Sequence, residues 1–196
     1  MRTKIACLAT LTLAIASGAA FAQETDWTGF YGGVSLATHD GTHDYVDISD
    51  LYDLEGSAVS VFAGRLWDTG ILVYGAEIAA SSGGVYEREF DGSESYEDEY
   101  EYTRFLDLKG RVGYDVKGFL VYGTLGVSRA RFLSDFSINT NATGMVLGMG
   151  ADYQLGDRYF VGAEYLRRNY DFYEPSEDSD VDADVSTFSL RAGIKF

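Results

Sequence analysis

Length, composition and charge already exclude several classes of protein. The chain has 196 residues, enough for one domain. It contains 23 Gly but one Pro, together with 15 Tyr and 12 Phe, a composition that favours an all-β protein over a helical one. The formal net charge of −16 argues against nucleic-acid binding and against simple electrostatic attraction to anionic lipid surfaces.

The first 22 residues have the three parts of a secretory signal peptide. Arg2 and Lys4 precede an apolar run over residues 5–15, and an A-x-A cleavage motif ends at Ala22. The alternative is a transmembrane helix, which needs about 20 apolar residues, more than this run provides. Cleavage would remove Cys7, the single cysteine, so we expect an exported protein without a disulfide.

The remaining residues, 23–196, are predicted to form one domain of alternating strands. They contain no run of about 18 apolar residues, so no membrane-spanning helix is expected. Transmembrane strands need only about 9–11 residues with alternating apolar and polar side chains. Eight segments fit this pattern: 29–38, 57–67, 71–81, 103–114, 119–129, 142–153, 159–170 and 185–196.

The connections between these segments fall into two kinds. Three are tight and rich in Gly or Asp, at 68–70, 115–118 and 155–157. Four are long and polar, at 39–56, 82–102, 130–141 and 171–184, and they hold 22 of the 31 carboxylates. Short turns at one end and long loops at the other predict an all-β, eight-stranded antiparallel up-and-down transmembrane β-barrel with acidic extracellular loops.

The more apolar side of each strand is assigned to the membrane. This choice points one aromatic residue per strand outward near the end with the short turns. A ring of aromatic side chains at headgroup level is typical of transmembrane barrels, whereas a soluble eight-stranded barrel is the alternative that alternation alone leaves open. The predicted periplasmic girdle consists of Phe30, Trp67, Tyr74, Tyr114, Phe119, Tyr153, Tyr159 and Phe196.

The opposite side of the strands carries both acids and bases. An eight-stranded barrel is only wide enough for its own side chains to fill, and unpaired charges there would be costly. We therefore predict a closed lumen filled by ion pairs, with a proton or ion path as the alternative. The predicted network consists of Glu77, Asp107, Lys109, Arg111, Asp152, Glu164, Arg168, Arg191 and Lys195.

Three arginines raise separate questions. Arg65 has the parity of Trp67 and would face lipid, unless it snorkels to the headgroups or a bulge turns it inward. Arg129 and Arg131, at the outer end of their strand, are candidates for contact with the phosphates of lipopolysaccharide.

The sequence resembles the bacterial outer-membrane β-barrel proteins called porin-family or opacity-type surface antigens. They are close in architecture to the OmpA transmembrane domain and OmpX. The similar stretches are "DWTGFYGGVSLA", "LKGRVGYDVKGFLVYGTLGVS", "GMGADYQLGDRYFVGAEYLRRNY" and the C-terminal alternation that ends at Phe196. The resemblance implies a monomer in the outer membrane of a Gram-negative bacterium, which the barrel-assembly machinery recognises by its last strand. Asp152 and Leu166 depart from the family pattern, in which Glu and Arg are usual.

Neither a catalytic centre nor a cofactor or metal site is expected. The only histidines, His39 and His43, fall in the first predicted loop without a partner that the sequence can place beside them. The acidic runs in the second and fourth loops lack the spacing of an EF-hand and are interpreted as solvated surface, with Ca²⁺ binding as the alternative. The expected function is non-enzymatic: envelope integrity and surface contacts through the loops. A narrow pore and an adhesin are the alternatives.

Overall fold

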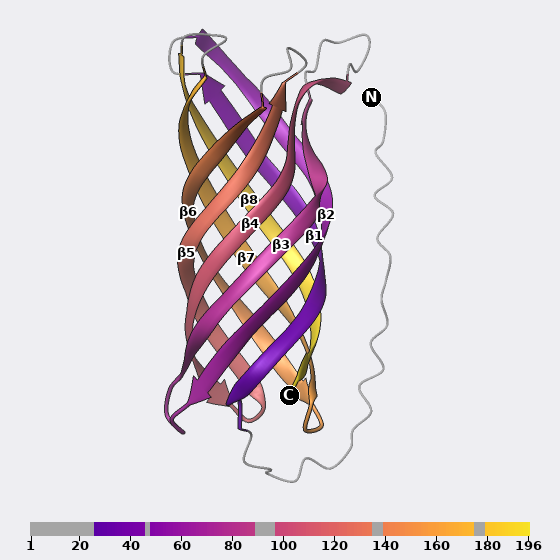
Figure 1. Cartoon of the computed structure of the whole chain (residues 1–196), viewed down its shortest axis with the longest axis vertical. Helices are drawn as coiled ribbons and strands as arrows, with labels where there is room; N and C mark the ends of the chain where they lie inside the picture. Colours follow the sequence, from indigo (N-terminus) through magenta and orange to yellow (C-terminus); the bar gives the residue numbers. More distant parts are fainter. Residues whose placement is uncertain (1–25, 46–47, 89–96, 135–138, 175–178) are drawn as a thin grey trace, which may run out of the picture.

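The structure is a computed structural model that describes residues 26–45, 48–88, 97–134, 139–174 and 179–196. Every element in these ranges is a strand (Figure 1). No helix in the described ranges is long and apolar enough to cross a membrane. The predicted signal peptide, residues 1–22, lies outside the described residues. In chain order the strands are β1 (Gly29–Tyr45), β2 (Ile48–Asp68), β3 (Val73–Arg88), β4 (Glu97–Val116), β5 (Phe119–Ser134), β6 (Asn139–Leu155), β7 (Tyr159–Glu174) and β8 (Ser179–Lys195).

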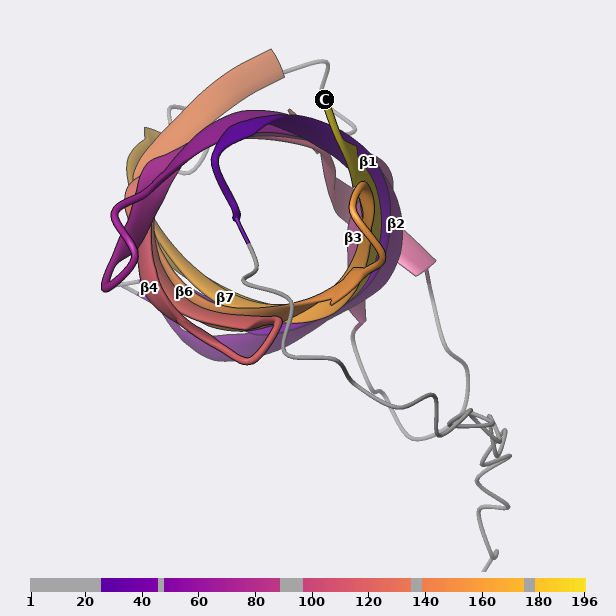
Figure 2. The same ribbon diagram turned by 90° about the horizontal axis from the view of Figure 1, so that it is seen from below.

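The strands close into a barrel. Each pairs antiparallel with the next, and β8 pairs with β1, so the wall is continuous when seen along the axis (Figure 2). At the closing seam the Phe196 N–H donates to the Phe30 carbonyl at 2.9 Å. Closure satisfies the backbone groups of both edge strands, as a lipid environment requires. The predicted fold is confirmed.

The strands are longer than the sequence predicted, and the predicted extent of the four long loops was wrong. β1 continues seven residues past residue 38 to Tyr45, and β2 begins at Ile48, so nearly all of the predicted loop 39–56 is strand. Polar residues end the apolar face but not the pairing, because backbone hydrogen bonds need no apolar side chains. The wall therefore extends beyond the apolar belt at the end where the acids gather.

The short turns have the geometry that hairpins favour. Lys117 and Gly118 both have positive φ, 55° and 85°, as in type I′ turns, whose twist matches that of the flanking strands. The Gly118 N–H also donates to Asp115 Oδ1 at 2.9 Å. The chain thus reverses within two residues between β4 and β5.

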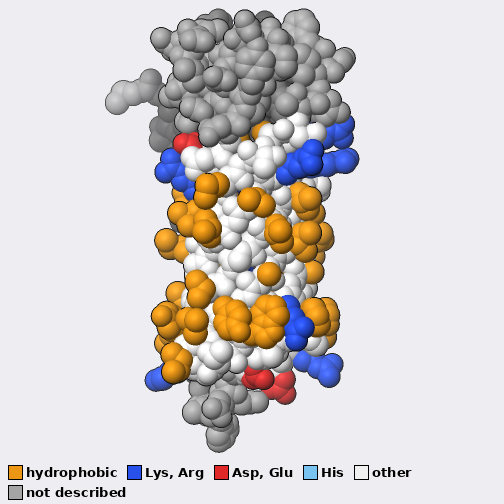
Figure 3. All heavy atoms as spheres, turned by 60° about the vertical axis from the view of Figure 1, so that its left-hand side comes forward, with side chains coloured by type: hydrophobic (Ala, Val, Ile, Leu, Met, Phe, Trp, Pro, Cys, Tyr) orange, Lys and Arg blue, Asp and Glu red, His pale blue; other side chains and the backbone are white. Residues whose placement is uncertain are grey.

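The outer wall carries an apolar belt with aromatic rings at its lower edge (Figure 3). All eight residues of the predicted girdle are exposed on this wall. We define the belt as the outward side chains from each girdle residue to the position eight residues further up its strand, and the structure describes all of them. Almost all are apolar, small or hydroxylic. The two charged ones are Arg65 and Arg167. Eight to ten residues at about 3.3 Å, tilted by about 40°, span ~20–25 Å, the height expected of a transmembrane barrel's apolar band.

Candidate functional site

The lumen is the most polar buried part of the described protein. Eight of the nine charged residues predicted to face inward are buried there: Glu77, Asp107, Lys109, Arg111, Asp152, Glu164, Arg168 and Arg191. They come from β3, β4, β6, β7 and β8, and they comprise four carboxylates and four cations. The buried charges of the described lumen therefore balance without any group from outside.

Glu77 on β3 is the centre of the larger cluster. Its carboxylate oxygens lie 3.0 Å from Lys109 Nζ, 3.1 Å from Arg111 Nη1 and 2.6 Å from Arg191 Nη2. Two further carboxylates complete the cluster. Asp152 lies 2.7 Å from Arg111 Nη2, and Glu164 lies 2.8 Å from Lys109 Nζ. Three cations and three carboxylates thus share one network, which we call the Glu77 cluster.

Two tyrosines belong to the Glu77 cluster, and the sequence analysis did not identify them. Tyr31 donates to Glu77 Oε2 at 2.8 Å and accepts from Arg111 at 3.0 Å. The Arg111 guanidinium also stacks over the Tyr122 ring, 3.5 Å from its centroid. The available signal was their inward parity, since each directly follows an outward-facing residue, Phe30 or Val121.

A second, smaller cluster lies further along the lumen. Arg168 Nη2 donates to Asp107 Oδ2 at 2.6 Å, and its Nη1 donates to Thr187 Oγ1 at 2.6 Å. Ser128 donates to the other oxygen of Asp107 at 2.5 Å. We call this group the Asp107 cluster.

The placement of His39 in a solvated loop was wrong. His39 is part of β1, it is buried, and its Nδ1 lies 2.8 Å from Thr187 Oγ1 beside the Asp107 cluster. The strand continues past the predicted loop boundary, so the inward parity of β1 reaches this residue. The side chain of His43 lies outside the described ones.

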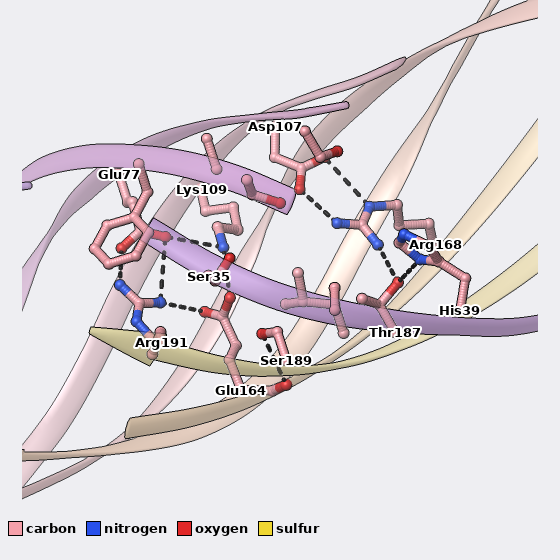
Figure 4. Close-up of a pocket in the computed structure, with 16 residues that line it drawn as sticks. Ser35, His39, Glu77, Asp107, Lys109, Glu164, Arg168, Thr187, Ser189 and Arg191 are labelled. Atoms are coloured by element: carbon pink, nitrogen blue, oxygen red, sulfur yellow. Dashed lines mark hydrogen bonds and ion pairs between the residues drawn. The ribbon is translucent and has the colours of Figure 1, made fainter. Parts of the chain in front are cut away.

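A small cavity touches both clusters (Figure 4). Its volume is about 30 Å³, and its walls include Ser35, Ser189, His39 and charged groups of each cluster. Since a water molecule needs a cavity volume of at least about 10–15 Å³ measured in this way, the cavity has room for one or two water molecules. His39 Nε2 is buried without a hydrogen-bond partner among the described residues, so a water here would have a polar atom to bind.

Apolar side chains form layers at both ends of the charged region, which the sequence analysis did not predict. At the end with the short turns, Trp27, Phe62, Leu66 and Phe160 pack with the rings of Tyr31 and Tyr122. At the opposite end, the layer consists of Phe105, Ala130, Ala142, Tyr170, Ala183 and Val185. The described lumen is therefore filled in layers: apolar, charged, apolar.

Lys195, the ninth predicted member, is separate from the network. It is half-buried at the short-turn end, where its Nζ donates to Gln154 Oε1 at 3.1 Å and to the Asp26 carbonyl. Hydrogen bonds from Thr28, the backbone N–H foremost, hold the pKa of Asp26 below its usual value. Lys195 thus fastens the segment before β1 to the end of β8.

The outer wall gathers arginines at the upper edge of the apolar belt. Arg104 on β4 pairs in register with Arg131 on β5, and Arg129 lies two residues further down β5. Arg104 and Arg129 are exposed and Arg131 is half-buried. The structure therefore adds Arg104 to the two arginines that the sequence singled out, and we call the three the upper arginine cluster.

The calcium hypothesis largely concerns residues outside the described ones. The acidic runs of the second and fourth predicted loops fall mainly at 83–103 and 171–182, where no side chain is described. Among the described side chains, no group of His, Cys, Asp and Glu has the arrangement of a metal site.

Comparison with known proteins identifies a family with this architecture. Residues 7–196 match the family described as outer membrane protein beta-barrel domain. A "22 kDa outer membrane protein" of Rhizobium leguminosarum bv. viciae is 29% identical over 187 residues, which cover 87% of this chain and 78% of the relative.

Solved structures share the fold at low sequence identity. Neisserial surface protein A (NspA) is 12% identical with a TM-score of 0.56, over 86% of this chain and 98% of the other. OprG of Pseudomonas aeruginosa is 14% identical with a TM-score of 0.55, over 88% and 98%. The family match covers nearly the whole chain. The chain therefore belongs to the outer membrane protein β-barrel family and is a protein of the bacterial outer membrane.

Proposed function

We propose that the protein is a non-enzymatic, non-conducting barrel that contributes to the integrity of the outer membrane and presents an acidic surface to the outside. The observation that carries the proposal is the balanced set of four carboxylates and four cations buried across the lumen. Buried charges that already have partners offer a passing ion no unfilled site, and separating them costs several kcal/mol.

The layers around the charges support a closed lumen. Among the described side chains, mostly apolar groups lie above and below the charges, and such groups cannot replace the hydration shell of an ion. Between the clusters it would find about 30 Å³, too little for a hydrated ion. The barrel size is consistent with this, since eight strands leave an interior that side chains fill.

Conductance measurements test the closed lumen. We expect the folded protein to give no steady conductance in planar lipid bilayers, at either polarity, in 1 M KCl. A general porin reconstituted in the same bilayers is the positive control, and heat-modifiable migration in gels shows that the sample is folded. Large, stable openings in the folded sample would contradict the proposal.

The distribution of charge supports a surface role for the opposite end. The four predicted loops hold 22 of the 31 carboxylates, and the strands carry these segments beyond the apolar belt. We infer that this acidic end contacts cationic groups or surfaces outside the cell, because its field attracts positive charge.

The upper arginine cluster suggests lipopolysaccharide as a partner in the outer leaflet. Arg104 and Arg129 lie ten residues from Tyr114 and Phe119 of the girdle, which places them about 25 Å above it, where the apolar band ends. Guanidinium groups bind phosphate through paired hydrogen bonds. The phosphates of lipopolysaccharide are the anions that this leaflet offers at that height.

Removing the two exposed arginines tests this contact. We expect the double variant Arg104→Gln, Arg129→Gln to retain roughly tenfold less lipopolysaccharide than the wild type after purification in mild detergent. The matched control is Lys117→Gln, Arg158→Gln, which removes two exposed cations at the periplasmic end. Equal lipopolysaccharide content in all three folded proteins would count against the contact.

A further inference from the structure

Arg65 is a cation on the lipid-facing wall in the periplasmic half of the belt. It lies on β2, where it is exposed, and it pairs in register with Phe30 of β1 and Ala76 of β3. Two residues further along β2 is Trp67 of the girdle. Of the two alternatives raised for Arg65, the bulge is wrong, since the pairing of Arg65 with both neighbouring strands is regular.

Two aromatic rings hold the guanidinium of Arg65. Its central carbon lies 4.9 Å from the centroid of the Phe30 ring and 5.0 Å from that of Trp67. Trp67 is itself stacked on Tyr74, with ring centroids 5.7 Å apart. The aromatic contacts therefore place the charge at the level of the girdle, where phospholipid headgroups begin.

No carboxylate within the described residues is in ion-pair contact with Arg65. The other charged residue of the belt, Arg167, has such a partner in Asp184 at 3.0 Å. The contacts with the rings leave the five N–H donors of the guanidinium in need of acceptors. On the β3 side the neighbour is Ala76, whose methyl group is too short to block the approach of a larger acceptor.

We propose that Arg65, Phe30 and Trp67 form a binding site for the phosphate of a glycerophospholipid in the periplasmic leaflet. The phosphate accepts paired hydrogen bonds from the guanidinium edge, and the two rings hold the guanidinium and contact the glycerol and upper acyl region. The lipid thereby supplies a counter-ion for Arg65. This site is independent of the proposed closed lumen and of the lipopolysaccharide contact, because it lies in the opposite leaflet.

Native mass spectrometry of the folded full-length protein tests the site. The protein is released from three kinds of micelle, which contain phosphatidylglycerol, dioleoylglycerol or inorganic phosphate alone. Dioleoylglycerol has the acyl tails without the phosphate. We expect phosphatidylglycerol to be retained by the wild type and dioleoylglycerol not to be. Arg65→Gln should weaken retention of phosphatidylglycerol about tenfold. The retention of phosphatidylglycerol by Arg65→Lys should lie between that of the wild type and that of Arg65→Gln, since an ammonium lacks the planar fork that binds phosphate and stacks on rings.

Two controls separate this site from general charge effects. Lys117→Gln removes a cation from the periplasmic turn, and Arg104→Gln, Arg129→Gln removes two from the upper edge. Both should retain phosphatidylglycerol as the wild type does. Equal retention by folded Arg65→Gln would overturn the proposal, as would equal binding of inorganic phosphate, which would indicate a site for free anions. Heat-modifiable migration of every variant identifies the folded samples.

A second measurement reports on the site directly. Trp27 is buried in the lumen, whereas Trp67 is exposed beside Arg65, so a quencher in the membrane reaches only Trp67. We expect phosphatidylglycerol brominated near the headgroup to quench the fluorescence more strongly than brominated dioleoylglycerol at the same concentration. The excess should disappear in Arg65→Gln. An unchanged excess in that variant would contradict the assignment to Arg65.

Discussion

Glu77→Ala is expected to destabilise the barrel by about 3–5 kcal/mol, the cost typical of breaking a buried ion pair by removing one partner. The Glu77 carboxylate contacts three cations at 2.6–3.1 Å and also accepts from the Tyr31 hydroxyl. Without it, Lys109, Arg111 and Arg191 share only Asp152 and Glu164. One buried positive charge is then left without a counter-ion.

The loss is measured by equilibrium unfolding in urea with the protein in phospholipid vesicles. Asp184→Asn is the control, because Asp184 pairs with Arg167 on the exposed wall and such pairs contribute about 0–1 kcal/mol. The loss of stability in Glu77→Gln should be smaller than in Glu77→Ala and larger than in Asp184→Asn, since an amide keeps an acceptor for Arg191 and Tyr31 but not the charge. Similar stabilities of Glu77→Ala and Asp184→Asn would mean that the lumen charges are not a coupled network.

The sequence was sufficient to predict which residues face inward and which face lipid. Alternation has a period of two, so assigning one face of a strand assigns all of its positions. This is why all eight girdle residues lie on the outer wall. The same parity placed Arg65 toward lipid, although the simplest energetic expectation was against it.

The partners within the lumen could not be predicted in the same way. Which inward residues meet across the barrel depends on the stagger of the strands, and parity does not fix it. The stagger brings Arg168 of β7 to Asp107 of β4, and Arg191 of β8 to Glu77 of β3. His39 was missed for a related reason: polar residues above the belt were interpreted as loop, whereas strand pairing continues through them.

The outer wall has cations near both headgroup levels, despite the acidic character of the chain. Arg65 lies near the girdle, and Arg104 and Arg129 lie at the upper edge of the belt. Cations in the middle of the belt would cost about 2–4 kcal/mol each, whereas near the interfaces the cost falls to about 0–1 kcal/mol. Phosphates at the two levels would turn this small cost into attraction, which would help to fix the height of the barrel in the membrane.

Gly64→Val is expected to destabilise the barrel by on the order of 3 kcal/mol through the same network, without changing any charge. Gly64 of β2 is paired in register with Tyr31, whose ring lies over it. A Cβ at position 64 would lie 2.5 Å from the Tyr31 hydroxyl oxygen and 2.5 Å from the Ala76 carbonyl oxygen. The Tyr31 ring has to move, and the contact with the Ala76 carbonyl oxygen can be relieved only by a shift of the backbone that weakens the pairing of β2 with β3.

Displacement of Tyr31 would remove its hydrogen bonds to Glu77 and Arg111, which adds the cost of unsatisfied buried groups to that of overpacking. Gly110→Val is the matched control. Gly110 is exposed on the outer wall, and the nearest atom to a Cβ there is the Leu125 carbonyl oxygen at 3.6 Å, an ordinary contact. Urea unfolding in vesicles should therefore place Gly110→Val within about 0.5 kcal/mol of the wild type. Equal losses in both variants would show that any added bulk in the wall is costly, and that the contact of Tyr31 with Gly64 has no special role.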